Sequence, residues 1–236
     1  MRILDGRIGR LLRPTLIDRV DRDHLQTDAA YRRRRIVVAI TTVLGATLLG
    51  ISLAVRPEDP AFFPLTFGLA ALWVIGGFAS GPLHLGWSGS AHGLRRPILT
   101  PVLIGVAVGV VFVLGSLAVR QIPPLYRVVE TVLAHARFGS LPLVALVTLL
   151  NGIAEEVFFR GALFAAIGIR RPVLLSTLIY GIATIATANY MLVFSALVLG
   201  LVLGLERRAT GGVLAPILTH VTWSTIMLFV LPPLFA

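Results

Sequence analysis

The chain has 236 residues, of which 56% are apolar and only 14% are charged, and its mean hydropathy is +0.89. This composition leaves too little polar surface to cover a soluble globule, so a soluble enzyme is excluded. No cysteine is present, which also excludes a disulfide framework, a thiolate zinc site and a cysteine nucleophile. All 21 basic residues are arginine and the net charge is +10, so arginine alone carries the information on membrane orientation.

The N-terminal segment, residues 1–35, is a basic tail. It holds ten arginines and five aspartates, which gives a net charge of +5. Apolar residues recur at helical spacing between the arginines. This pattern fits an amphipathic helix lying on an anionic membrane leaflet, but the favoured interpretation is a solvated tail that obeys the positive-inside rule. The interspersed aspartates interrupt any continuous basic stripe, so we expect no nucleic-acid partner.

Residues 36–236 are predicted to form one transmembrane helical domain. A helix needs about 20 apolar residues to cross the hydrocarbon core. Runs of roughly that size, each bounded by charged residues, glycine or proline, occupy residues 36–55, 62–78, 98–119, 141–164, 172–188, 191–205 and 213–235. The sequence therefore predicts an all-α polytopic integral membrane protein, with about seven transmembrane helices in one bundle.

The placement of arginine predicts the orientation, because short arginine-rich loops stay on the cytoplasmic side. Arginines at 32–35 precede the first run, and arginine pairs at 95–96, 170–171 and 207–208 fall on the same side of the bundle. We therefore expect a multi-pass protein of the cell (inner or plasma) membrane, with the N-terminus in the cytoplasm and the lipid bilayer around it. Residues 120–137 carry positive charge on the opposite side and are predicted to be an interfacial segment.

The fourth apolar run contains Glu155, Glu156 and Arg160. Each charge at the centre of a membrane helix costs roughly 2.5 to 3.5 kcal/mol on insertion scales, so these groups must be paired or lie near a wet cavity. Glu156 and Arg160 are four residues apart and can meet on one helix face. Glu155 is rotated by about 100° from Glu156 and shares a face with Asn151, so Glu155 is the carboxylate left for chemistry.

His220 is the histidine that falls within a predicted span. Counted as helical rise from the cytoplasmic ends of their helices, His220 lies about 10 Å deep and Glu155 about 9 Å deep. We therefore predict that these two side chains face each other in a wet pocket. Such a pair can activate a water for attack on a peptide carbonyl, with the imidazole as metal ligand or oxyanion donor. It can also pass protons, as in a proton-coupled carrier.

The segment 155–161 resembles the Glu-Glu-x-x-x-Arg signature of the CPBP family, the CAAX-protease and bacteriocin-processing intramembrane proteases that are also called Abi proteins. Residues 176–184 are similar to the segment that carries the family's aromatic-x-x-x-His motif. Residues 201–220 are similar to the run that leads into its last motif, His-x-x-x-Asn/Asp. The resemblance covers about residues 140–230, the expected family core.

The resemblance implies a helical fold with a polar cavity open to the cytoplasm. It also implies an endopeptidase acting on a membrane-associated peptide or protein substrate, which in the eukaryotic branch is a prenylated CAAX tail. By motif position Glu155 would be the water-activating base, with Glu156 and Arg160 as its structural or metal-side neighbours. His220 would be a metal ligand or oxyanion contact. The resemblance leaves two alternatives open, a metal ion and a glutamate-bound water without a metal. The candidate metal is zinc, with His220 and Glu155 as candidate ligands.

Two positions depart from the family's motifs. Thr184 stands where the second motif has histidine, and Ser224 where the last motif has asparagine or aspartate. A threonine hydroxyl can hydrogen-bond a water but is a poor zinc ligand, so a His₂-carboxylate set cannot be completed within the spans. One hypothesis is an active endopeptidase in which Thr184 and Ser224 bind water or the oxyanion. The other is a catalytically degenerate homologue, a membrane binding or scaffold protein with a membrane-protein partner.

Overall fold

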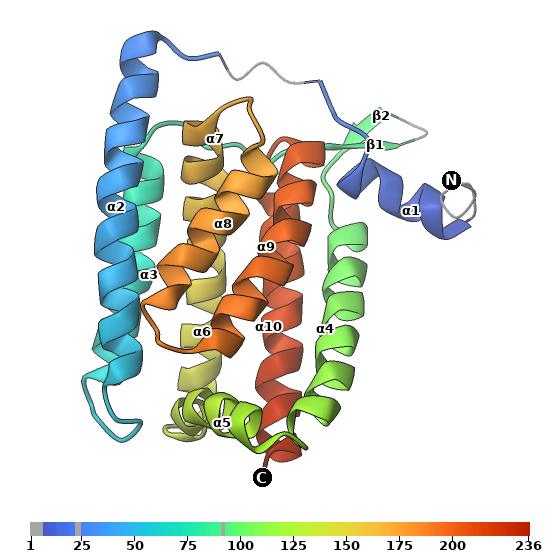
Figure 1. The fold of residues 1–236 in the computed structure, drawn as a ribbon. Helices are drawn as coiled ribbons and strands as arrows, with labels where there is room; N and C mark the ends of the chain where they lie inside the picture. The colour runs from blue at the N-terminus through green and yellow to red at the C-terminus, as the bar shows by residue number, and fades with distance from the viewer. Residues whose placement is uncertain (1–6, 22–24, 91–92) are drawn as a thin grey trace.

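In the computed structural model, which describes residues 7–21, 25–90 and 93–236, the chain forms an upright bundle of helices (Figure 1). The elements in chain order are α1 (Arg7–Leu16), α2 (Asp28–Ala54), α3 (Phe62–Ala79), β1 (Ser88–Ser90), β2 (Gly93–Arg95), α4 (Leu99–Val119), α5 (Pro123–Arg137), α6 (Leu141–Glu156), the π-helix η2 (Val157–Leu163), α7 (Phe164–Ile167), α8 (Pro172–Ile185), α9 (Tyr190–Thr210) and α10 (Leu214–Leu234). The two strands pair as a small antiparallel hairpin.

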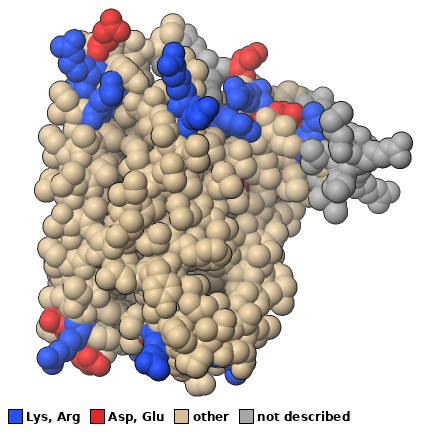
Figure 2. All heavy atoms as spheres, in the orientation of Figure 1, with Lys and Arg blue, Asp and Glu red and all other residues tan. Residues whose placement is uncertain are grey.

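Within the described residues, six helices are long and apolar enough to cross a membrane: α2, α3, α4, the continuous helix from α6 to α7, α9 and α10. The 14-residue α8 is shorter but also apolar. Together they match the seven predicted spans. Figure 2 shows an uncharged belt between two rims that carry the arginines and acids. The chain is therefore a polytopic all-α membrane protein.

Two of these helices run further than their apolar cores. α2 begins at Asp28 because the Thr27 side chain caps it, accepting a hydrogen bond from the backbone N–H of Ala30 at 3.3 Å. α9 continues to Thr210 and ends at Gly211, which adopts the left-handed conformation (φ +73°). Capping residues rather than the change in polarity thus set these ends, and α9 carries charged residues into the bundle.

The segment predicted to be interfacial is helix α5, which lies across the end of the bundle opposite α1 (Figure 1). The Tyr126 hydroxyl donates a hydrogen bond to the Phe235 carbonyl at 3.0 Å. The Arg137 guanidinium donates one to the Pro232 carbonyl, also at 3.0 Å. These contacts attach α5 to the end of α10, so α5 covers the bundle instead of crossing it.

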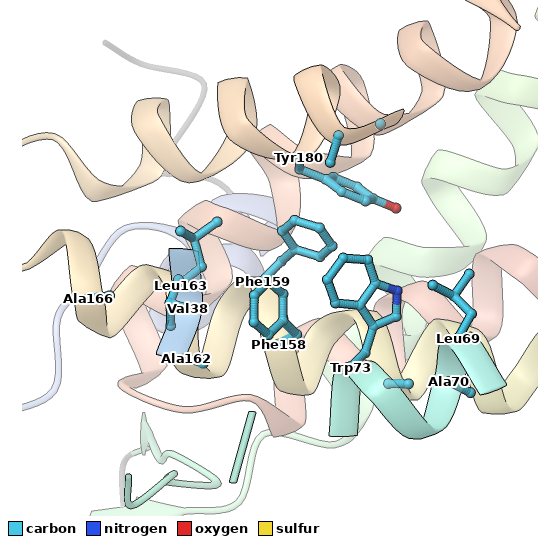
Figure 3. Packing of buried hydrophobic residues seen from close by; sticks show 13 residues of the cluster. Val38, Leu69, Ala70, Trp73, Phe158, Phe159, Ala162, Leu163, Ala166 and Tyr180 are labelled. Atoms are coloured by element: carbon cyan, nitrogen blue, oxygen red, sulfur yellow. The ribbon is translucent and has the colours of Figure 1, made fainter. Parts of the chain in front are cut away.

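An aromatic cluster forms the centre of the core (Figure 3). The centroid of the Trp73 ring on α3 lies 4.7 Å from that of Phe158 and 5.1 Å from that of Phe159. The ring centroids of Phe159 and of Tyr180 on α8 are 4.5 Å apart. Gly45 on α2 makes room for Trp73, since a Cβ at that position would come within 2.0 Å of the indole. The cluster therefore fixes η2 between α3 and α8, directly after the two glutamates.

Candidate active site

The site lies where the fourth span changes its winding. α6 ends at Glu156, and the next seven residues form the π-helix η2. π-helical turns are rare, and they occur often at functional sites because the extra residue in the turn redirects the side chains around it. Every residue of η2 is buried, so Arg160 points into the bundle instead of toward lipid.

Glu156 is the centre of a buried polar cluster. Its Oε1 atom accepts a hydrogen bond from Arg160 Nη1 at 2.9 Å and lies 2.8 Å from His220 Nδ1. The predicted pairing of Glu156 with Arg160 is confirmed, and the exposed fractions of the two side chains are 0% and 1%. Each partner therefore offsets part of the cost of burying the other's charge.

His220 pairs with Glu156, and not with Glu155 as predicted. The imidazole remains close enough to Glu155 for an electrostatic interaction. Gly152 lies one turn before Glu156 on the same face of α6, where a Cβ would come within 3.5 Å of the His220 ring. Helical rise gives the depth of a side chain but not the rotation of its helix, and α6 turns the face of residues 152 and 156 toward α10, so the direct contact of His220 is with Glu156.

Glu155 faces α8. Its Oε2 atom accepts a hydrogen bond from the Tyr180 hydroxyl, and the glutamate side chain is only partly buried. The Tyr180 ring lies beneath the Arg160 guanidinium, 4.8 Å from the guanidinium carbon to the ring centroid. No other hydrogen bond reaches Glu155 from the described part of the chain, which leaves its Oε1 atom for a water or a substrate.

Sequence inspection missed the role of Tyr180. The residue is the aromatic member of the segment that resembles the aromatic-x-x-x-His motif, and a phenol differs from phenylalanine in carrying a hydroxyl. That hydroxyl could have been noted as a polar group inside an apolar span. Its direction, toward Glu155 on another helix, required coordinates.

Glu206 is a second fully buried carboxylate, beside Glu156, and sequence inspection also missed it. It is fully buried on α9, accepts a hydrogen bond from Thr219 Oγ1 at 2.7 Å, and interacts electrostatically with Glu156 and Arg160. Its neighbour Arg207 donates a hydrogen bond from Nε to the Arg160 backbone carbonyl at 2.7 Å. The charges of residues 206–208 are typical of a loop. However, Gly211 is a residue type that often ends a helix, and its position indicates that the helix continues through these charged residues.

The two substituted motif positions differ in what they contact. Thr184 is buried and its hydroxyl donates to the Tyr180 carbonyl at 2.8 Å, one turn back in the same helix. Ser224 is buried one turn after His220 on α10, and residues four apart share a helix face. Thr184 is therefore engaged with its own backbone, while Ser224 stands on the face of α10 that presents the imidazole.

A cavity of about 100 Å³ lies beyond Arg160 along the helix, at the end of the bundle near α1. Gly161 and the basic side chains of Arg34, His84 and Arg207 contribute to its wall. Burial, and then the guanidinium groups of Arg207 and Arg34, lower the pKa of His84 below its ordinary value. Glu155 and His220 do not line this cavity, so it is not the wet pocket predicted around that pair.

The donor atoms at the site do not fit a zinc ion. No group of three or more His, Asp or Glu side chains in the described ranges is arranged to hold a metal. Glu156 already binds both a guanidinium and the Nδ1 atom of His220, and a second cation beside Arg160 would be repelled. His220 and Glu155 alone fall short of the three protein ligands of a catalytic zinc site.

Residues 137–226 match the family profile described as type II CAAX prenyl endopeptidase Rce1-like. The matched region runs from the end of α5 into α10 and contains every side chain of the polar cluster around Glu156. No curated protein and no solved structure gives a significant match to the chain. The match covers less than half of the chain, and within it residues 137–226 are similar to a CAAX-type prenyl endopeptidase.

Proposed function

We propose that the protein is an intramembrane endopeptidase that cleaves a membrane-associated peptide or protein tail with a water activated by Glu155. The observation that carries the proposal is the position of this carboxylate. It stands partly exposed beside a buried ion-pair cluster, with one oxygen held by Tyr180. The family profile that residues 137–226 match is described as an endopeptidase, which supports the same reaction class.

Glu155 acts as the general base. The carboxylate oxygen that Tyr180 does not bind takes a proton from a water, and the hydroxide attacks the carbonyl carbon of the scissile peptide bond. When the tetrahedral intermediate collapses, the protonated Glu155 returns this proton to the leaving nitrogen and the C–N bond breaks. The hydrogen bond from Tyr180 fixes the carboxylate in one orientation throughout.

His220 stabilises the oxyanion. The Glu156 carboxylate lies against Nδ1, so this nitrogen carries a proton and the ring orientation is fixed. In the protonated imidazole Nε2–H is a second donor, directed away from Glu156 and able to bind the developing negative charge. Arg160 is a positioning residue, because it holds Glu156 in place without reaching the reacting atoms.

We further propose that the N-terminus lies on the cytoplasmic side of the cell (inner or plasma) membrane. The rim near α1 carries Arg32–35, Arg95 and Arg96, whereas the opposite rim mixes arginines with Glu58, Asp59 and Glu130. An excess of arginine in short loops marks the cytoplasmic side. In this orientation the 100 Å³ cavity opens at the cytoplasmic end of the bundle.

A catalytically degenerate homologue that binds a membrane-protein partner is the second candidate. It is favoured by Thr184, whose hydroxyl is engaged with the Tyr180 carbonyl and not with the polar cluster. A scaffold needs no general base, so in this case Glu155→Gln would leave partner binding on co-purification unchanged. The endopeptidase proposal requires the opposite result, loss of a measurable cleavage.

Cleavage in isotopically labelled water tests the proposed reaction. The full chain, reconstituted in vesicles with a set of membrane-anchored peptides in H₂¹⁸O, is expected to release fragments whose new carboxyl group carries ¹⁸O. The label enters because water supplies the attacking oxygen. Mass spectrometry of the fragments measures it, and Glu155→Gln vesicles serve as the control for contaminating proteases. Absence of cleavage across the set would favour the scaffold hypothesis.

Tyr180→Phe is expected to lower kcat about 10- to 100-fold with little change in KM. A hydrogen bond to a charged group contributes about 1.5–3 kcal/mol, and each 1.36 kcal/mol is tenfold in rate. The phenylalanine ring preserves the packing on Phe159. Tyr190→Phe is the matched control, because it also removes a tyrosine hydroxyl, one that donates to the Pro124 carbonyl far from the site. Equal kcat in the two variants would show that the Tyr180 hydroxyl is not needed.

A further inference from the structure

A groove of about 960 Å³ lies outside the site, at the rim that carries α1. It runs between α1, the β1–β2 hairpin and the start of α4, which meet at one corner of the bundle (Figure 1). Its walls combine cationic and apolar side chains, among them Arg19, Arg95, Arg96, Leu11, Leu94 and Leu99. The proposed reaction uses none of these residues.

The walls of the groove are fixed by contacts to the bundle. Thr15 on α1 is buried, and after α1 the Val20 N–H donates to the Ala209 carbonyl of α9 at 3.0 Å. On the other wall Arg96 donates to the Gly86 carbonyl at 2.7 Å and its guanidinium lies 3.6 Å from the centroid of the Trp87 ring. Both walls of the groove are therefore held in place by specific contacts to the rest of the protein.

The groove has an excess of positive charge. Arg19 and Arg95 are exposed, and their side chains make no ion pair or hydrogen bond within the described part of the chain. The acids that also line the groove are Asp18 and Asp21, and Asp18 is already paired with Arg13 at 3.3 Å. Two guanidinium groups thus remain for an anionic ligand, whose charge they would complement.

An apolar stripe leads out of the groove along α4. Leu99, Leu103, Val106 and Val110 are spaced by four, three and four residues, which places them on one helix face. Their exposed fractions are 66%, 40%, 40% and 50%. A soluble anion would not contact this apolar surface, whereas the hydrocarbon chains of an amphiphile would bury it.

We propose that this groove is a binding site for an anionic phospholipid. The headgroup phosphate lies between Arg19, Arg95 and Arg96, and the acyl chains lie along the exposed stripe of α4. The charge excess selects an anionic headgroup, and the continuity of the basic groove with the apolar stripe selects a lipid over a free phosphate. This site is independent of the proposed protease activity.

Lipid binding to two charge-matched variants tests the proposal. The groove variant is Arg19→Gln/Arg95→Gln, and the control is Arg56→Gln/Arg120→Gln, two exposed arginines at the opposite rim. The full chain in detergent is titrated with phosphatidylglycerol or phosphatidylcholine, and native mass spectrometry counts the bound lipids. We expect wild type and control to prefer phosphatidylglycerol, and the groove variant, which lacks two arginines near the anionic headgroup, to bind it about 30-fold more weakly.

Each of the other outcomes overturns the proposal. Equal loss in the two double variants would mean that overall charge, and not the groove, attracts the lipid. Equal binding of both phospholipids to the wild type would mean that the site does not select an anionic headgroup. Displacement of phosphatidylglycerol by glycerol phosphate at the same concentration would mean that the groove binds a soluble anion and that the α4 stripe contributes nothing.

Discussion

Replacing Glu155 with glutamine is expected to lower kcat by about 10²- to 10⁴-fold, the range that a positioned general acid or base contributes. The amide oxygen of glutamine can still accept the hydrogen bond from Tyr180, but a neutral amide cannot take a proton from water. The fold should therefore survive while the chemistry stops. The measurement is kcat and KM on a peptide that the wild type cleaves, together with the melting temperature in detergent.

The matched control for this experiment is Glu58→Gln. Glu58 is an exposed acid in the loop between α2 and α3, at the rim opposite α1. Its replacement makes the same chemical change without touching the bundle interior, so kcat should stay at the wild-type value. Full activity in Glu155→Gln with normal melting would assign the base to another residue. A large drop in melting temperature would make Glu155 structural.

Replacing Arg160 with methionine is expected to lower the free energy of unfolding by about 3–5 kcal/mol, the usual cost of removing one partner of a buried ion pair. The change leaves the Glu156 carboxylate in the bundle interior with His220 as its remaining partner. It also removes the cation above the Tyr180 ring. Thermal unfolding in detergent measures the effect, which should be among the largest of any single substitution in the chain.

Arg137→Met provides the comparison, because Arg137 also forms an ion pair, with Glu130, at a partly exposed position. Exposed ion pairs contribute about 0–1 kcal/mol. Arg137→Met also removes the hydrogen bond to the Pro232 carbonyl, so this variant should unfold below the wild-type temperature but well above Arg160→Met. The double variant Glu156→Gln/Arg160→Met should recover part of the lost stability, since it removes the unpaired charge. Similar melting of Arg160→Met and Arg137→Met would show that the Glu156 pair does not stabilise the bundle.

The spans could be predicted from the sequence because a lipid bilayer demands both length and apolarity from each helix. The same requirement made it possible to recognise Glu155, Glu156 and Arg160 as candidate site residues, because charges in an apolar run need a partner. Helical spacing then correctly predicted the contact between Glu156 and Arg160, which lie in one helix. Contacts within a single element are therefore well determined by the sequence.

Contacts between helices were predicted less well, because they depend on how each helix is rotated about its axis. Depth alone assigned His220 to Glu155, although Gly152 and Glu156 form the face of α6 that meets α10. The π-helical turn was not foreseen either, since an apolar run carries no period that separates a π-helix from an α-helix. Glu206 was overlooked because adjacent charges at a span end resemble a loop.

The absence of a side chain at Gly152 leaves space for the His220 ring between α6 and α10. A methyl group there would come no closer than 3.5 Å to the His220 ring, an ordinary contact, so alanine fits between α6 and α10. A branched side chain would reach further and would wedge the ring away from Glu156. Because residue 152 has no side chain, the backbone of α6 can lie close to α10 at the level of His220. A residue larger than alanine at this position would weaken the contact between the imidazole and Glu156.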